Sequence, residues 1–185
     1  MTNIKQNDLI QSVADAFQFI SYYHPKDFIT AMGKAYELEE GHGAKDAIAQ
    51  ILTNSRMCAE GHRPLCQDTG IAVVFLKIGM NVQWPDATMS VTDMVNEGVR
   101  RAYLNPDNML RASVLSDPAG KRKNTGDNTP AVIHNEIVPG DDVEVICAAK
   151  GGGSENKAKM VMLNPSDSIV DWVLKTVPKM GAGWC

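Results

Sequence analysis

The sequence predicts an α/β or α+β fold in which N-terminal helices are followed by a mixed sheet flanked by helices. Three observations support this fold class. Residues 1–60 carry apolar side chains at helical spacing, later apolar runs bounded by turn residues are typical of strands, and an amphipathic helix stands between those runs. Helices followed by strands that alternate with helices are typical of layered structures.

Helical periodicity dominates the N-terminal part of the chain. The first helix has an apolar residue at every third or fourth position from Ile10 to Ile20 and breaks before Pro25, because proline disfavours helix in the residue before it. A second helix is expected over residues 25–40, with the proline at its first position. A third helix is expected over residues 44–59.

Strands are expected in the remainder of the chain. The run from Ile71 to Ile78 is almost continuously apolar, which indicates a central strand buried on both faces. A turn at Pro139-Gly140-Asp141 separates two more apolar runs. The predicted strands are residues 71–78, 131–138, 142–149 and 158–163, and the predicted helices are residues 91–104, capped by Ser90 or Thr92, and 165–177.

Length and composition exclude several classes of protein. The 185 residues allow one ordinary domain or one lobe of a larger protein. No apolar run approaches the roughly 18 residues that a membrane-spanning helix needs, and the N-terminus lacks the pattern of a secretory signal. We therefore expect a cytoplasmic protein that does not bind membranes.

The net charge of -4 argues against a nucleic-acid partner. The charge is unevenly distributed, because the stretch from Arg100 to Lys123 holds six basic residues and two acidic ones, a local charge of +4. Either this stretch is a solvated face or some of its charges bind an anionic substrate.

Two loops contain more polar and glycine residues than packing requires. Cys66-Gln67-Asp68-Thr69-Gly70 places a thiol, an amide and a carboxylate just before a strand, where they could serve as ligand and acid/base groups or form an ordinary loop. Lys150-Gly151-Gly152-Gly153-Ser154 could turn its backbone N–H groups towards an anion, or form a flexible hairpin loop. Asp68-Thr69-Gly70 also spells the aspartic-protease triplet, but the chain has one copy and its N-terminal part is helical, which does not suit an all-β protease.

Four cysteines stand at positions 58, 66, 147 and 185, and none forms a C-x-x-C pair. Taken singly, each is explained as a small buried apolar side chain in a reducing compartment. The surroundings of Cys185 also permit a metal-binding role, because it follows Gly181-Ala182-Gly183. Glycines before a metal-bound thiolate let the backbone donate hydrogen bonds to sulfur.

Four stretches carry a resemblance to a known family: residues 54–70, residues 122–134, residues 150–157 and Gly183-Trp184-Cys185. Together they resemble the N-terminal domain of the class I, iron–sulfur-dependent fumarate hydratases, with the related tartrate dehydratase alpha subunits as the main alternative. The resemblance implies reversible hydration of fumarate to (S)-malate by a [4Fe-4S] cluster whose open iron acts as a Lewis acid. It also implies a dicarboxylate substrate and a homodimeric complete enzyme.

By motif, the resemblance assigns roles to individual residues. Cys66 and Cys185 are implied as cluster ligands, the third cysteine is expected outside this chain, and Cys58 and Cys147 remain buried thiols. Asp68 is implied in proton transfer. The residues implied in substrate binding are Gln67, Asp68, Arg111, Gly152 and Gly153.

The resemblance also implies that residues 1–185 form a single N-terminal, alpha-type domain whose C-terminal partner domain is absent, so that the chain alone would be inactive. A competing interpretation is an isolated α/β domain that serves as a binding or assembly module. A continuing reading frame with another cysteine would favour the enzyme.

Overall fold

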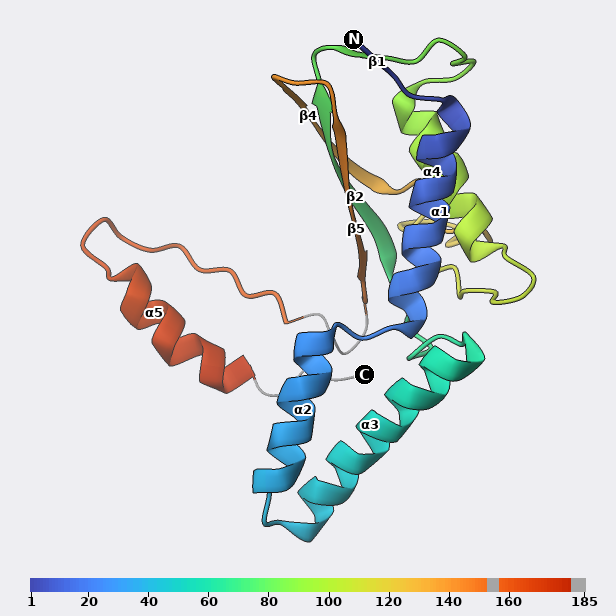
Figure 1. Ribbon diagram of the computed structural model, residues 1–185. Coiled ribbons are helices and arrows are strands. Elements are labelled where there is room, and N and C mark those ends of the chain that lie inside the picture. The colour runs from blue at the N-terminus through green and yellow to red at the C-terminus, as the bar shows by residue number, and fades with distance from the viewer. Residues whose placement is uncertain (153–156, 181–185) are drawn as a thin grey trace.

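The computed structural model of the protein describes residues 1–152 and 157–180 and combines helices with a mixed sheet, which confirms the predicted fold class (Figure 1). None of the helices in the described part of the chain has both the length and the apolar content that crossing a membrane requires. In chain order the elements are β1 (Thr2–Asn3), α1 (Gln6–Tyr22), α2 (Lys26–Leu38), α3 (His42–Gly61), β2 (Ile71–Gly79), β3 (Val82–Gln83), α4 (Val91–Tyr103), β4 (Val132–Val138), β5 (Val143–Lys150), α5 (Ile169–Thr176) and the 3-10 helix η1 (Val177–Met180).

The main sheet has the order β4-β2-β5, with β2 parallel to β4 and antiparallel to β5. Strand β2 is central, as its sequence predicts, but it is not buried on both faces. Its side chains alternate, with Val74 and Leu76 buried and Phe75 44% exposed. Helices cover one face of the sheet in Figure 1, so only alternate side chains of β2 meet a second layer.

The core lies between the sheet and the helices α1 and α4, which run side by side over it (Figure 1). The two helices approach closely at Gly98, where an added Cβ would lie 2.7 Å from the carbonyl oxygen of Ile10. Ser90 caps α4 by accepting a hydrogen bond from the N–H of Asp93. The buried apolar residues of this core are Leu9, Ile10, Val13, Ala14, Phe17, Ala72, Val74, Leu76, Met94, Val95, Val99, Ala102, Tyr103 and Leu110.

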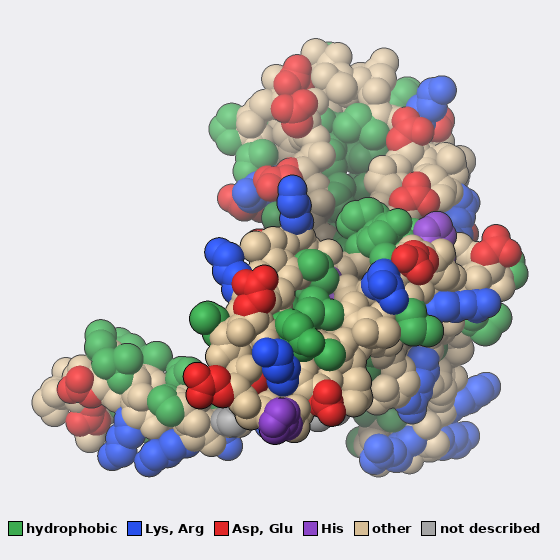
Figure 2. All heavy atoms as spheres, turned by 60° about the horizontal axis from the view of Figure 1, so that its bottom comes forward, with side chains coloured by type: hydrophobic (Ala, Val, Ile, Leu, Met, Phe, Trp, Pro, Cys, Tyr) green, Lys and Arg blue, Asp and Glu red, His purple; other side chains and the backbone are tan. Residues whose placement is uncertain are grey.

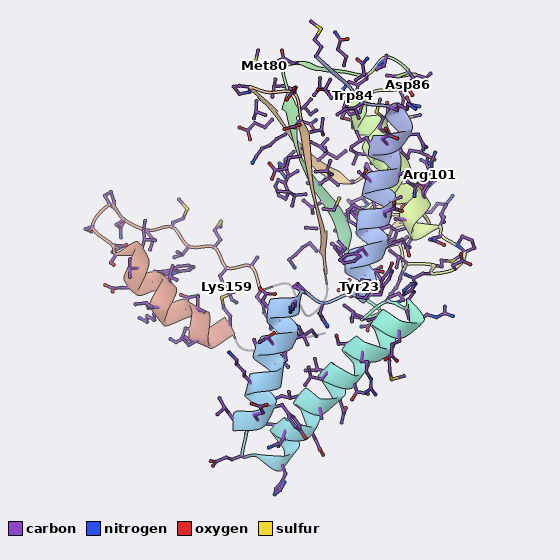
Figure 3. The ribbon with its side chains drawn as sticks, viewed as in Figure 1. Tyr23, Met80, Trp84, Asp86, Arg101 and Lys159 are labelled. Carbon is purple, nitrogen blue, oxygen red and sulfur yellow. The ribbon has the colours of Figure 1, made fainter. Side chains whose placement is uncertain are left out.

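A small additional contact fixes the start of the chain. Strands β1 and β3, which the sequence did not reveal, pair in parallel over two residues. Asp86 accepts a hydrogen bond from the N–H of Gln6 at 2.9 Å, and Figure 3 shows Trp84 and Asp86 beside the first turn of α1. This contact supplies a partner for one of the N–H groups that a helix start leaves unpaired.

Helices α2 and α3 form a hairpin beyond one end of the sheet, and Tyr23 marks the point where α1 gives way to it (Figure 3). Helix α2 has no buried residue, whereas α3 buries Ser55 and Cys58 near its C-terminal end. The hairpin therefore contacts the rest of the protein mainly through the end of α3 that leads into the loop before β2.

The strand predicted over residues 158–163 does not form, and this segment is irregular. It leads away from the sheet in Figure 1, so its backbone has no neighbouring strand with which to pair. The helix after it begins at Ile169 rather than at Pro165, because Ser168 accepts a hydrogen bond from the N–H of Asp171 and caps it. Figure 2 shows this part as a projecting lobe with hydrophobic side chains on one side and Lys or Arg side chains on the other.

Candidate functional site

The loop between α3 and β2 is held at its start by the end of α3. His62 follows the helix with a left-handed backbone (φ 46°), which turns the chain back on itself. The side-chain N–H of Asn54 donates to the carbonyl of Leu65 at 2.9 Å, and the thiol of Cys58 donates to the carbonyl of Pro64 at 3.5 Å. Burial raises the pKa of the Cys58 thiol, so this group stays protonated and acts as a donor.

A cavity of about 850 Å³ opens beside this loop. Cys66, Gln67 and Asp68 all line it, and Lys150 lines it from the end of β5. Helices α1 and α3 supply apolar and polar wall residues, including Phe17 and Asn54. A concave site with a few convergent polar groups is the usual form of a small-molecule site.

Strand pairing brings the two polar loops together although they are about eighty positions apart in the sequence. Ile71 at the start of β2 is paired with Lys150 at the end of β5, so the loop before β2 and the glycines after β5 lie at the same end of the sheet. Gly70 has φ +77°, and an added Cβ would lie 2.8 Å from the backbone of Lys150. Only glycine permits this approach.

The predicted site residues are not all placed by the structure. Gly152 is exposed just beyond Lys150. Gly153 and Cys185 lie outside the described residues. Arg111 is exposed and does not line the cavity, but its backbone carbonyl accepts a hydrogen bond from the Thr69 hydroxyl at 2.6 Å, so the segment that carries it contacts the loop.

The three described cysteines differ in their surroundings. Cys66 lines the cavity, and the N–H of Asp68 lies 3.4 Å from its sulfur. Cys58 faces Asn54 and Pro64, and Cys147 packs against the core side of the sheet, where burial raises the pKa of its thiol to about 11. Cys58 is buried, as its sequence context predicts, whereas Cys147 is only partly buried.

The described residues supply part of a metal-ligand set, but not a complete one. No group of three or more His, Cys, Asp or Glu side chains that could hold a metal ion occurs within residues 1–152 and 157–180. One thiol, that of Cys66, faces the cavity with a backbone N–H directed at its sulfur, and such an N–H stabilises a metal-bound thiolate. These residues therefore fit one attachment point of an iron–sulfur cluster.

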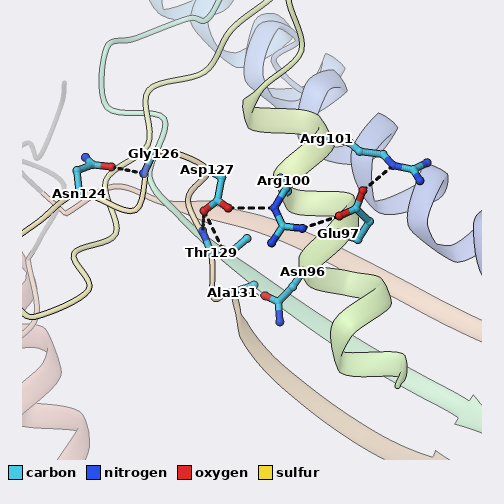
Figure 4. A network of polar contacts seen from close by, with 9 residues as sticks. All are labelled: Asn96, Glu97, Arg100, Arg101, Asn124, Gly126, Asp127, Thr129 and Ala131. Atoms are coloured by element: carbon cyan, nitrogen blue, oxygen red, sulfur yellow. Dashed lines mark hydrogen bonds and ion pairs between the residues drawn. The ribbon is translucent and has the colours of Figure 1, made fainter. Parts of the chain in front are cut away.

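The basic stretch of the sequence is used partly for structure (Figure 4). The guanidinium of Arg100 lies 2.6 Å from the Glu97 carboxylate (Nη1 to Oε2) and 3.0 Å from the Asp127 carboxylate (Nε to Oδ2). The Nε of Arg101 lies 3.1 Å from Oε1 of Glu97. The hydrogen bond to Asp127 raises the pKa of Arg100. Burial alone would raise the pKa of Asp127, but hydrogen bonds from Thr129 and Arg100 outweigh it and the pKa lies below its ordinary value. Arg100 and Arg101 thus belong to a structural network that joins α4 to Asn7 of α1 and to Asp127.

Tyr103 is a site residue that sequence reasoning placed only in the core. Its hydroxyl lies 2.8 Å from the carbonyl oxygen of Thr69 and 3.2 Å from that of Gly70, so it supports the loop from behind. Burial raises the pKa of Tyr103 to about 12, which keeps the hydroxyl protonated as a donor. A tyrosine at a predicted core position could have indicated this contact, since a buried tyrosine hydroxyl needs a hydrogen-bond partner.

Comparison with known proteins decides the family. A family model described as fumarate hydratase (Fumerase) matches residues 10–185. The chain belongs to this family. It is 33% identical over 179 residues to a protein of Methanocaldococcus jannaschii that carries the name L(+)-tartrate dehydratase subunit alpha, covering 94% of the chain. It is 30% identical over 180 residues to the anaerobic class I fumarate hydratase of Escherichia coli K12, covering 95% of the chain.

The match extends over only part of each of these relatives. The chain spans 62% of the length of the Methanocaldococcus jannaschii protein and 31% of the Escherichia coli fumarate hydratase. It spans 59% of the L(+)-tartrate dehydratase subunit alpha of Escherichia coli O157:H7, to which it is 25% identical over 182 residues. The cavity beside Cys66 therefore lies in a region that family members of very different lengths share.

Proposed function

We propose that this chain is the N-terminal, alpha-type domain of an iron–sulfur hydro-lyase that interconverts fumarate and (S)-malate. The observation that carries the proposal is the cavity in which Cys66, Gln67 and Asp68 meet Lys150. A thiol, an amide, a carboxylate and a cation at one cavity are the groups needed to hold a cluster, move a proton and bind an anion. Membership of the fumarate hydratase family supports the choice of reaction.

When bound, a [4Fe-4S] cluster with one open iron would supply a Lewis acid for the loss or gain of hydroxide. Cys66 would hold it from the cavity wall, and the N–H of Asp68 would stabilise the negative charge on that sulfur. We propose Cys185 as the second ligand. A third cysteine would come from outside this chain.

The remaining residues of the cavity have separate tasks in this proposal. The carboxylate of Asp68 takes or returns the proton at the carbon next to the hydroxyl-bearing one. The amide of Gln67 donates to one carboxylate of the substrate. Arg111 and Gly152 do not line the cavity, but they stand in segments beside its loop, and in this proposal they and Gly153 bind a substrate carboxylate, since a dianion needs cationic and N–H donors to replace water.

The ligand assignment is tested by Cys66→Ser in the enzyme that contains this chain, with Cys58→Ser as the matched control. After anaerobic reconstitution with iron and sulfide, we expect Cys66→Ser to lose the visible absorbance of the cluster and the hydration of fumarate. Cys58→Ser should keep both, because its hydroxyl can donate to Pro64 as the thiol does. Cluster absorbance and activity retained in Cys66→Ser would show that Cys66 is not a ligand.

A second test concerns the chain by itself. In this proposal the third cysteine ligand and part of the substrate contacts come from outside this chain. Residues 1–185 alone should therefore not hydrate fumarate after the same reconstitution. The ultraviolet absorbance of fumarate would be followed over time. Robust turnover by this chain would overturn the proposed division of the site.

Tartrate is the second candidate substrate. The chain covers twice as large a share of the Methanocaldococcus jannaschii protein, named as a tartrate dehydratase subunit alpha, as of the Escherichia coli fumarate hydratase. The ratio of kcat/KM for fumarate hydration to kcat/KM for L-tartrate dehydration separates the two. A ratio above one supports the fumarate assignment, and a ratio below one replaces it with tartrate.

The proposal also includes a homodimeric complete enzyme in the cytoplasm. Its mass in solution, measured by light scattering on the complete enzyme, tests the dimer. A monomeric mass at working concentration would contradict this part alone.

A further inference from the structure

Asn128 is a fully buried polar residue close to the candidate site, with a relative exposure of 0%. It lies in the turn between α4 and β4 and has a left-handed backbone, with φ 62°. Asparagine adopts this conformation more readily than other side-chain-bearing residues do. A buried amide is costly unless its donors and acceptor are paired, so its contacts indicate what it holds.

The Asn128 side chain joins three segments of the chain. Its Oδ1 accepts hydrogen bonds from the N–H of Ser113 at 2.7 Å and of Val114 at 3.3 Å. Its Nδ2 donates to the carbonyl of Gly70 at 3.0 Å. One amide thus connects the end of the loop that carries Cys66, Gln67 and Asp68 to the segment that follows Arg111.

The turn that carries Asn128 is itself fixed on α4 (Figure 4). Asp127 accepts hydrogen bonds from the N–H and hydroxyl of Thr129 and pairs with Arg100. The side chain of Asn96 accepts from the N–H of Ala131 at 2.9 Å. Contacts on both sides of Asn128 therefore tie its backbone to a helix of the core.

We infer that Asn128 is a positioning residue that sets the distance between the Gln67–Asp68 loop and the Arg111 segment, and so determines which dicarboxylate fits between them. The inference rests on the proposed function, in which these two segments bind one substrate. Asn128 does not line the cavity and would not touch the substrate. It acts through the backbone, where misplacement by about 1 Å can cost roughly a hundredfold in rate.

The chemistry of the amide explains why a different side chain would not serve. The Asn128 side chain donates to the Gly70 carbonyl and accepts from the N–H groups of Ser113 and Val114, so it needs both a donor and an acceptor. An ionised carboxylate has no donor, and glycine has neither group. The direct bond from the Thr69 hydroxyl to the Arg111 carbonyl joins the same two segments at a further point.

The first test compares Asn128→Gly with Asn108→Ala in the enzyme that contains this chain. Glycine keeps the left-handed backbone and removes all three bonds. Asn108 is also buried, at 3% exposure, but its amide donates to Gln18 and Ser21 of α1. The two variants should lose similar stability.

We expect Asn128→Gly to raise KM for fumarate at least tenfold and to reduce at least tenfold the preference for fumarate over its methyl-substituted analogue. Asn108→Ala should keep that preference within about twofold. An Asn128→Gly enzyme with unchanged KM and preference would overturn the inference.

A rescue experiment uses Asn128→Asp. The protonated carboxyl group can donate to Gly70 and accept from Ser113, so it mimics the amide, whereas the ionised form cannot donate. The kcat/KM of this variant relative to the unsubstituted enzyme should therefore rise as the pH falls. A ratio that is independent of pH would contradict the donor role of Asn128.

Amide hydrogen exchange separates failure of this inference from failure of the proposed function. Asn128→Gly should speed exchange in residues 66–70 and 111–114, and Asn108→Ala should not. If no dicarboxylate is turned over but this difference is seen, the proposed function is wrong and Asn128 still links the two segments. Unchanged exchange in Asn128→Gly rejects the positioning role itself.

Discussion

The sheet with α1 and α4 and the C-terminal arm (residues 157–180) have similar apolar content but opposite surroundings. In the first region Phe17, Val74 and Val95 are each at most 1% exposed. In the arm, α5 and η1 bury no residue, and Ile169 and Leu174 are 68% and 69% exposed. An amphipathic pattern alone is therefore not enough to bury an element, because burial requires a second apolar layer.

The candidate site lies in the well-packed region, beside the sheet and α1. Its loop is supported by Tyr103, Asn54 and Asn128, each of which donates to a backbone carbonyl of the loop or its end. Residues 1–152 and 157–180 leave the opposite face of the sheet without a second layer, with Phe75 stacked on His134 and Lys77 paired with Glu144 at 3.0 Å. These hydrogen bonds therefore hold the candidate loop on the packed side of the sheet.

Truncation of a core ring, Phe17→Ala on α1, should destabilise the protein strongly. Removing this buried ring should lower the free energy of unfolding by about 3–5 kcal/mol, from lost burial and the cavity left behind. Phe19→Ala, on the same helix but 56% exposed, should cost less than about 1 kcal/mol. Urea denaturation followed by circular dichroism measures both, and equal losses would show that α1 is not packed as described.

A smaller effect concerns the network around Asp127. Because the pKa of Asp127 is lower in the folded protein, its contribution is present above the unfolded pKa and is lost as pH falls through the folded pKa. Arg100 is about half exposed, so solvent screening limits the contribution to roughly 0.5–1 kcal/mol. In Asp127→Asn, the free energy of unfolding should fall by this amount less than in the unsubstituted protein as the pH is lowered. A curve that is parallel to that of the unsubstituted protein would contradict the pairing.

The smallest effect is expected in the arm. Leu174→Asp should change the free energy of unfolding by less than about 0.5 kcal/mol, because the side chain already lies in water. Val95→Asp, at a fully buried position of α4, should prevent folding as the contrasting control. A loss of several kcal/mol from Leu174→Asp would mean that the arm is packed against another surface in solution.

The elements that local patterns specify were predictable. The periodicity of α1 and of α4 identified the buried side chains, and the turn at Gly140 separated β4 from β5. The strand expected at residues 158–163 failed because an apolar run does not provide the neighbouring strand that its backbone needs. The exposed face of β2 was missed for a related reason, since composition cannot say whether a second layer covers a sheet.

The fold class, the family resemblance and the candidate residues Cys66, Gln67 and Asp68 follow from local sequence, because each depends on neighbours along the chain. Three facts required the folded structure: Lys150 lines the same cavity as that loop, Arg100 is neutralised by acidic partners, and Asn128 links two distant segments. These facts depend on strand register and on helix packing. Both are set by burial of apolar surface between residues far apart in sequence, which no local pattern records.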